Sequence, residues 1–184
     1  MLQWVHRHRT KLGGQGALVY LAGEEAGGNL AAAVALMARD QAHPPLAGQI
    51  LLSPMLDPCV GSASQRRTTG DAVDCKWVQG WRNFLRCPRD AEHPYAVPAS
   101  AHRLAGLPPT LVLVGDTDPM RDEALAYAAR LHAAGLQVTQ HVFAKAEKWP
   151  EPLLETGPHE CPCAGAVQEE FRRFFEATRC RESS

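Results

Sequence analysis

Residues 19–30, which read VYLAGEEAGGNL, constrain the fold of this chain more than any other stretch. An apolar run passes through a glycine-containing corner into an alanine-rich pattern with helical spacing. That succession predicts a buried strand, a tight turn and a helix. Gly23 and Gly27 are expected where the strand and helix backbones approach closely, because glycine has no Cβ atom. Glu25 then stands at the tip of the turn.

The remaining pattern alternates between strands and helices. Strands are predicted at residues 17–22, 49–53, 110–115 and 138–144, and helices at residues 2–12, 29–40, 121–134 and 164–177. Because a helix of about a dozen residues joins the first two strands, they form a βαβ unit in a parallel sheet. The predicted fold class is therefore α/β, with about four strands flanked by helices in a single domain over residues 1–184.

Three of these helices carry apolar stripes that are expected to face the core. The stripes consist of Leu30, Ala33, Val34 and Met37; of Ala124, Tyr127, Ala128 and Leu131; and of Val167, Phe171, Phe174 and Phe175. Aromatic residues at helical spacing are far more often core than ligand site, so the last stripe is interpreted as a docking face.

Residues 57–102 lack the clear patterns of the segments on either side. Proline, glycine, arginine and cysteine predominate there, with scattered aromatic residues and a short helix expected near residues 76–85. Long connections of this kind tend to be functional loops or lids. We expect a lid-like insertion between the second and third strands.

Composition and charge exclude several classes of function. The formal net charge of −1 offers no electrostatic basis for binding nucleic acid or an anionic membrane surface. No run of about 18 apolar residues is present, so a membrane-spanning helix is not expected. The first residues, MLQWVHR, lack the apolar segment of a signal peptide, and a cytoplasmic location is expected.

The cysteines suggest neither a disulfide framework nor a metal centre. Six are present, but without an export signal most are expected to be reduced thiols. The segment HECPC at residues 159–163 resembles a cluster of metal ligands. Its cysteines are closer together than the usual zinc spacing and no second ligand pair follows, so neither a metal nor a cofactor is expected.

Two segments resemble signatures of one enzyme family. Residues 23–30, GEEAGGNL, are similar to the G-[DE]-S-A-G-G-N-L nucleophile elbow of the hormone-sensitive-lipase-like carboxylesterases, which have the α/β-hydrolase fold. Residues 115–124, GDTDPMRDEA, are similar to the D-P-L-R-D-E-G signature of that family. The resemblance implies a partial α/β-hydrolase fold with Glu25 at the nucleophile position and Asp118 as the triad acid. It also implies that the backbone N–H of Ala26 is an oxyanion donor.

The third triad position and part of the oxyanion site depart from the family. The family places a histidine shortly after the last strand, in a sequence such as A-x-H-x-F, and Lys148 stands at the aligned position here. His159 would serve as the base only if its loop folds back. An upstream H-G-G-G segment, which supplies further oxyanion donors in the family, is absent from this sequence. The resemblance covers nearly the whole chain but only the second half of the family's domain.

These departures predict impaired ester hydrolysis. Glu25 is a weaker nucleophile towards an ester than an activated serine, and Lys148 with an ordinary pKa of about 10.4 is a poor base near neutral pH. We therefore interpret the chain as a relative of carboxylic ester hydrolases with a site for a small acyl-ester-like ligand. Two alternatives stay open. One is an active hydrolase that uses Glu25 or is completed by a partner chain, and the other is a non-enzymatic binding or interaction module.

Two further expectations concern contacts. Glu25 and Lys148 are expected to form an ion pair beside Asp118, which would replace a catalytic relay with a structural one. The first strand, whose family counterpart lies centrally in the sheet, is expected to have an open edge. An apolar edge strand invites pairing, so a homodimer or a partner chain through this edge is expected.

Overall fold

The computed structural model describes residues 1–58, 62–69, 76–145, 149 and 163–179. Its elements are, in chain order, α1 (Leu2–Gly13), β1 (Tyr20–Glu24), α2 (Ala26–Asp40), β2 (Gly48–Leu52), α3 (Ala63–Thr69), α4 (Lys76–Phe84), the 3₁₀ helices η1 (Pro88–Glu92) and η2 (Pro98–Ser100), β3 (Thr110–Gly115), α5 (Arg121–Ala133), β4 (Val138–Phe143) and α6 (Ala164–Arg179). The predicted alternation of strands and helices is confirmed. The first strand begins later than expected, because its ladder with β2 starts at Tyr20 opposite Gly48.

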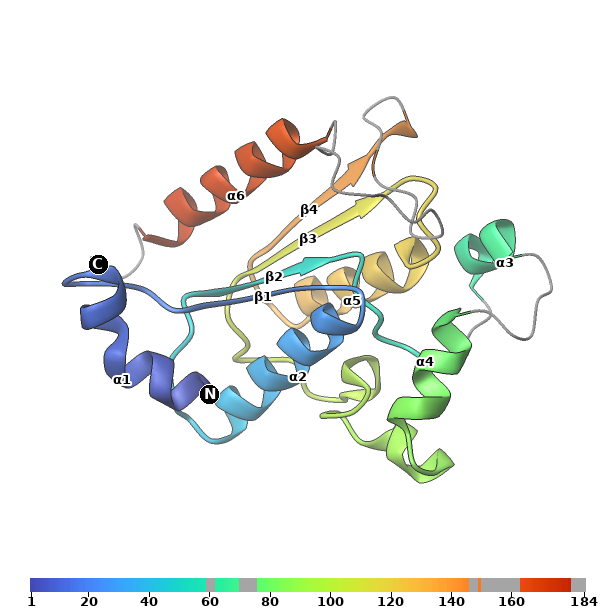
Figure 1. The fold of residues 1–184 in the computed structure, drawn as a ribbon, viewed down its shortest axis with the longest axis horizontal. Coiled ribbons are helices and arrows are strands. Elements are labelled where there is room, and N and C mark those ends of the chain that lie inside the picture. The colour runs from blue at the N-terminus through green and yellow to red at the C-terminus, as the bar shows by residue number, and fades with distance from the viewer. Residues whose placement is uncertain (59–61, 70–75, 146–148, 150–162, 180–184) are drawn as a thin grey trace.

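The four strands form one parallel sheet in the order β1-β2-β3-β4 (Figure 1). Sequential order with parallel pairing requires every connection to cross from the carboxyl end of one strand to the amino end of the next. β3 lies inside the sheet and all six of its residues are buried. The prediction of a parallel α/β fold is therefore correct.

Helices cover both faces of the sheet, giving three layers. α2 and α5 lie on one face and α6 lies on the other (Figure 1). Neighbouring residues of β2 point to opposite layers, as pleating requires: Leu51 packs with α2 and α5, whereas Ile50 packs with α6. This two-sided burial holds for β2 and β3 and explains why the residues of β3 read as a continuous apolar run.

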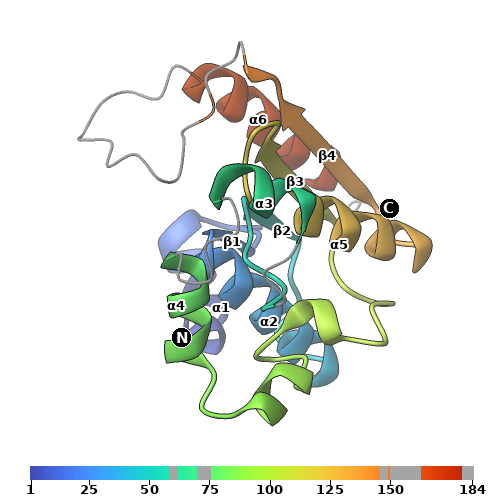
Figure 2. The same cartoon turned by 90° about the vertical axis from the view of Figure 1, so that its right-hand side faces the viewer.

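Part of the insertion between β2 and β3 lies beyond the carboxyl ends of the strands. The insertion contains α3, α4, η1 and η2, and Figure 2 shows α3 and α4 at that end of the sheet. Trp77 and Trp81 of α4 are buried against Met55, Val97 and Met120. The short helix expected in residues 57–102 is thus confirmed as α4. None of the helices in the described part of the chain is long and apolar enough to cross a membrane.

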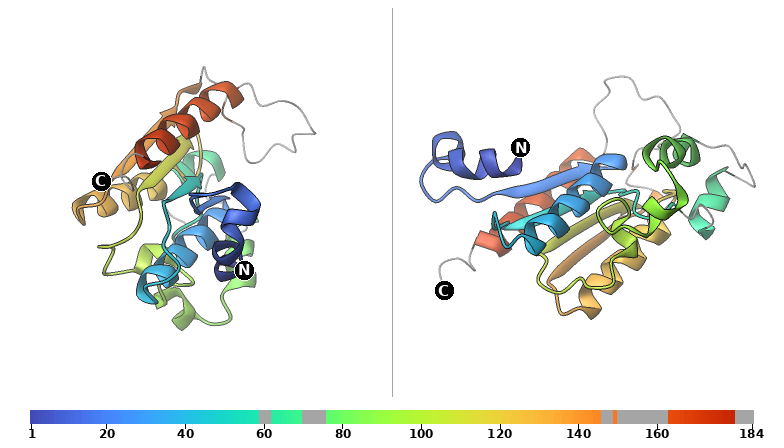
Figure 3. Two further views of the ribbon diagram at one scale, coloured as in Figure 1. Left: turned by 90° about the vertical axis from the view of Figure 1, so that its left-hand side faces the viewer. Right: turned by 90° about the horizontal axis from the view of Figure 1, so that it is seen from below.

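β1 lies at one edge of the sheet. In the described residues its ladder is formed with β2 alone. Figure 3 shows α1 near the amino-terminal end of β1, and α1 contributes no buried side chain. The open edge expected from the sequence is present in this part of the chain. Pairing of a second chain along it stays a prediction.

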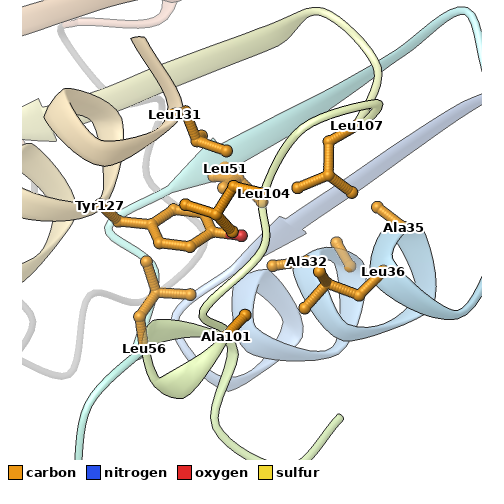
Figure 4. Close-up of a cluster of buried hydrophobic side chains, with 11 residues drawn as sticks. Ala32, Ala35, Leu36, Leu51, Leu56, Ala101, Leu104, Leu107, Tyr127 and Leu131 are labelled. Atoms are coloured by element: carbon orange, nitrogen blue, oxygen red, sulfur yellow. The ribbon is translucent and has the colours of Figure 1, made fainter. Parts of the chain in front are cut away.

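The core between the sheet and the α2–α5 layer includes Tyr127 and Leu131 of α5 (Figure 4). Leu51 of β2 and Leu36 of α2 belong to the same cluster and come from the sheet and the neighbouring helix. Residues 101–107, which lead into β3, close the cluster from the third side. The apolar stripe predicted for α5 is confirmed, because its four residues are the buried residues of that helix.

The buried face of α2 differs from the predicted one. Leu30 and Met37 are 53% and 36% exposed, whereas Leu36 is completely buried. Most of the buried side chains of α2 are alanines. Small side chains let the helix lie close to β1 and β2, and that close packing determines which face is turned inward. The predicted stripe was therefore wrong for Leu30 and Met37.

The aromatic stripe of α6 packs on the opposite face of the sheet as predicted. Phe174 is 2% exposed and contacts a cluster that includes Ile50, Leu113 and Phe143. The ring lies so close to β2 that a Cβ atom at Gly48 would be 2.8 Å from it. Val167, Phe171 and Phe175 of the stripe pack around the same cluster.

Replacing Phe174 by alanine tests this docking. We expect Phe174→Ala to lower the free energy of unfolding by about 3–5 kcal/mol, because it leaves a cavity under α6. Phe84→Ala is the matched control, since Phe84 is 47% exposed, and we expect a loss below about 1 kcal/mol. Urea denaturation measures both. Equal losses in the two variants would contradict the packing described for α6.

Candidate functional site

Glu25 occupies the tip of the turn between β1 and α2. Its backbone has φ 46° and ψ −116°, a conformation that is strained for a residue with a Cβ atom. Its N–H donates to the carbonyl of Leu52 at 3.0 Å, and its carbonyl accepts from the N–H groups of Asn29 and Met55. These bonds hold the strained residue in place. The predicted strand, tight turn and helix are present, with a carboxylate at the exposed tip.

The glycines of the turn have unequal roles. A Cβ atom at Gly23 would lie 2.1 Å from the carbonyl oxygen of Gly27, so this position requires glycine. A Cβ atom at Gly27 would meet nothing within 4 Å. At Gly28 it would lie 2.8 Å from Pro54, after β2. The prediction that close packing requires a residue without a Cβ atom is therefore correct for Gly23 and wrong for Gly27. Gly28 has this requirement instead, because α2 packs against the segment that follows β2.

Asp118 lies beyond the carboxyl end of β3 and is 2% exposed. Its Oδ2 accepts a hydrogen bond from the hydroxyl of Ser53 at 2.5 Å and another from the indole N–H of Trp149 at 3.1 Å. Its Oδ1 accepts from the backbone N–H of Met120 at 2.7 Å. Burial raises the pKa of this carboxyl, the three hydrogen bonds oppose that rise, and the charge of Glu25 adds to it.

Trp149 contacts the candidate triad acid, a position that the sequence analysis did not assign to it. Its ring stacks on Phe143, with centroids 4.8 Å apart and planes at 21°, and its N–H reaches Asp118. A Cβ atom at Gly115 would lie 2.6 Å from the indole, so that glycine makes room for the ring on the end of β3. The expected position, Lys148, lies outside the described residues. The family alignment after β4 can shift by one residue, and such a shift would place Trp149 at the third triad position.

Lys76 at the start of α4 is the described residue that pairs with Glu25. Its Nζ lies 3.6 Å from Oε1 of Glu25, and the two side chains are 46% and 34% exposed. The same ammonium lies 5.0 Å from the centroid of the Trp77 ring. Because Lys148 lies outside the described residues, the expected Glu25–Lys148 pair stays a prediction. The pair with Lys76 connects the turn to the insertion between β2 and β3.

A cavity with a volume of about 280 Å³ lies between the turn and α4. It is lined by Glu25, Ala26, Asn29, Leu30, Met55, Lys76, Trp77, Gly80, Trp81 and Phe84. Ala26 is the first residue of α2, where backbone N–H groups have no intrahelical acceptor, so its N–H is suited to bind an oxyanion. The walls are mainly aromatic and aliphatic, which is typical of small-molecule sites.

Glu123 is a second buried acid at this end of the sheet. Its carboxylate accepts hydrogen bonds from the backbone N–H groups of Leu56 and Asp57 and so fastens α5 to the segment after β2. Burial raises its pKa to about 8, against the effect of those two bonds, and the charges of Asp57 and Asp118 add to the rise. A carboxyl with this pKa takes up and releases a proton near neutral pH.

The described residues contain no group of three or more histidine, cysteine, aspartate or glutamate side chains placed to hold a metal ion. His159 and most of the HECPC segment lie outside these residues. Cys87 is a free, exposed thiol, as expected, whereas Cys163 is disulfide-bonded. Cys163 is therefore an exception to the expectation that most of the cysteines are reduced thiols.

Comparison with known proteins shows which proteins this chain resembles. A family described as the alpha/beta hydrolase fold matches residues 1–147. The esterase LipI of Mycobacterium tuberculosis is 32% identical over 143 residues, which are 76% of this chain and 44% of that protein. The gibberellin receptor GID1A of Arabidopsis thaliana is 38% identical over 128 residues, covering 65% of this chain and 36% of the receptor.

Solved structures agree with these relatives. An esterase from Pyrobaculum calidifontis superimposes with a TM-score of 0.79 at 30% identity, covering 96% of this chain and 58% of that one. The chain spans about half the length of the esterases that it matches.

The unequal roles of the glycines can be tested with a matched pair of variants. We expect Gly23→Ala to destabilise the fold by more than about 2 kcal/mol, because the new methyl group meets a backbone carbonyl. Gly27→Ala is expected to be neutral or to stabilise by about 0.5–1 kcal/mol, since alanine has the higher helix propensity. Thermal unfolding of both variants measures the difference, and a loss in Gly27→Ala as large as in Gly23→Ala would contradict the geometry.

The pKa of Glu123 makes stability depend on pH. The folded state holds the proton up to about pH 8, whereas the unfolded chain releases it near its ordinary pKa of about 4.5. Stability from this group is therefore present in full below about pH 4.5 and is lost as the pH rises to about 8, by a few kcal/mol. We expect Glu123→Gln to flatten this fall, measured as the difference in unfolding free energy between pH 5 and pH 8.5. A profile as steep as that of the unmodified chain would disprove this assignment.

Proposed function

Because the chain belongs to the α/β-hydrolase fold family and is related to its carboxylesterases, we propose that it is an esterase-type scaffold with impaired ester hydrolysis. Its ligand, on this proposal, is a small molecule resembling an acyl ester, held in the cavity beside Glu25. The observation that carries the proposal is the hydrogen bond from Trp149 to Asp118, because a catalytic triad needs a base at that oxygen.

A serine-type triad works by passing a proton through an imidazole. The acid accepts one N–H of the histidine, while the other ring nitrogen takes the proton of the nucleophile. The indole of Trp149 donates a hydrogen bond but has no second nitrogen that accepts a proton. Ser53 also donates to Oδ2 of Asp118. Among the described residues, neither donor to that oxygen has an imidazole that could transfer a proton.

The nucleophile position is impaired for a separate reason. Glu25 presents a carboxylate where the family has a serine hydroxyl, and a carboxylate repels the oxyanion that forms during ester hydrolysis. The N–H of Ala26 is the donor suited to that charge. Loss of one oxyanion donor typically costs about 10²- to 10³-fold in rate, and loss of triad members about 10⁴- to 10⁶-fold.

Two alternative functions have specific support. An active hydrolase is favoured by the placement of the Glu25 carboxylate at the edge of the cavity, and a partner chain docked along β1 would complete its site. A binding module is favoured by the relationship to a protein named as a gibberellin receptor. Hydrolysis assays separate these alternatives from the leading proposal.

Restoring the missing groups tests the proposal. We expect no hydrolysis of p-nitrophenyl acetate or butyrate by the unmodified chain. We expect activity in Glu25→Ser combined with Trp149→His, at least tenfold above Glu25→Ser combined with Lys148→His. The physical reason is that the side chain at position 149 reaches Asp118.

The controls separate loss of folding from loss of chemistry. Trp4→His in the Glu25→Ser background is the matched tryptophan replacement, since Trp4 is 49% exposed. Circular dichroism melts establish that each variant is folded. Hydrolysis by the unmodified chain that disappears in Glu25→Gln would overturn the proposal in favour of a hydrolase that uses Glu25.

A further inference from the structure

The cavity beside Glu25 contains a position that can bind a positively charged group. Nζ of Lys76 lies 3.6 Å from Oε1 of Glu25 and 5.0 Å from the centroid of the Trp77 ring. A carboxylate and the face of an indole both attract cations, the first by its full charge and the second by the negative face of its ring. A cation, supplied by the chain itself, is therefore already held at this point.

The remaining walls of the cavity suit an apolar body attached to such a cation. Leu30, Met55, Trp81 and Phe84 line the space of about 280 Å³ beyond the ion pair. Burial of each methylene group of a ligand against such walls strengthens binding by about fourfold. An alkylammonium or arylalkylammonium ion would place its charge at Glu25 and its hydrocarbon part among these side chains.

The ion pair between Glu25 and Lys76 is open to exchange. The two side chains are 34% and 46% exposed, and ion pairs with this access to water contribute little to stability. Another ammonium group can therefore take the place of Lys76 beside Glu25. An anionic ligand would gain from Lys76 but would be repelled by Glu25 and by the negative face of Trp77.

We propose that this cavity binds organic ammonium ions with an apolar body, and that the ammonium group of Lys76 competes with them for the position beside Glu25 and Trp77. The inference rests on the geometry of Glu25, Lys76 and Trp77 and does not require hydrolysis. Failure of the restored-triad experiment would leave it untouched, and failure of the binding experiment would leave the esterase-type scaffold untouched.

Three probes of equal chain length test the proposal: hexylammonium, hexan-1-ol and hexanoate. We expect isothermal titration calorimetry to show that hexylammonium binds the unmodified chain about tenfold more tightly than either of the others. Lys76→Gln is expected to tighten hexylammonium binding several-fold, because the competitor is gone. Glu25→Gln is expected to abolish the preference for hexylammonium over hexan-1-ol.

The opposite responses of the two variants make the test decisive. Lys11→Gln removes a lysine from α1, away from the cavity, and is expected to leave hexylammonium affinity unchanged. Circular dichroism melts establish that every variant is folded. The proposal is overturned if hexanoate binds best, if Lys76→Gln weakens hexylammonium binding, or if none of the three probes binds the unmodified chain or Lys76→Gln.

Discussion

The close approach of β1 to α2 is the constraint on which the candidate site depends. The carbonyl of Gly27 occupies the volume that a side chain at Gly23 would need, so the two backbones meet directly. This contact lets the chain reverse within one residue, Glu25, at a conformational cost of about 1–3 kcal/mol. Backbone hydrogen bonds to the segment that follows β2 offset that cost. The position of the carboxylate is therefore a property of backbone packing, and any residue at that position would project beside α4.

The parallel order of the strands then gathers side chains that are far apart in the sequence. Glu25, Ser53, Asp118 and Trp149 each follow a different strand, and all four lie at the carboxyl edge of the sheet. A buried carboxylate is costly unless it is hydrogen-bonded, and Asp118 receives three donors from three segments. Those bonds join the ends of β2, β3 and β4 into one unit, which is a structural role for a residue whose position resembles that of a catalytic acid.

The same edge places charged and aromatic side chains around Glu25. The ammonium of Lys76 and the indole rings of α4 lie beside the Glu25 carboxylate, whereas the hydroxyl of Ser53 at this edge donates to Asp118. The insertion between β2 and β3 supplies the aromatic side chains of the cavity wall through α4. The hydrogen bond from Asn29 to the carbonyl of Ala96 fastens that insertion to α2. The cavity is thus built jointly by the turn and the insertion.

The sequence by itself determined the α/β class, the strand–turn–helix unit at Glu25, the buried face of α5 and the place of Asp118. The first three depend on local periodicity and on turn residues, which can be recognised along the chain, whereas the place of Asp118 was implied by the resemblance of residues 115–124 to the family signature. Only the tertiary structure decided that α2 turns its alanines inward, that Gly28 and not Gly27 is packed, and that Trp149 reaches Asp118. Only it brought Lys76 to Glu25, across 51 positions of sequence (76 − 25). Such contacts depend on the distance between neighbouring layers and on where a loop packs against the rest of the fold. Neither can be read from a local sequence pattern.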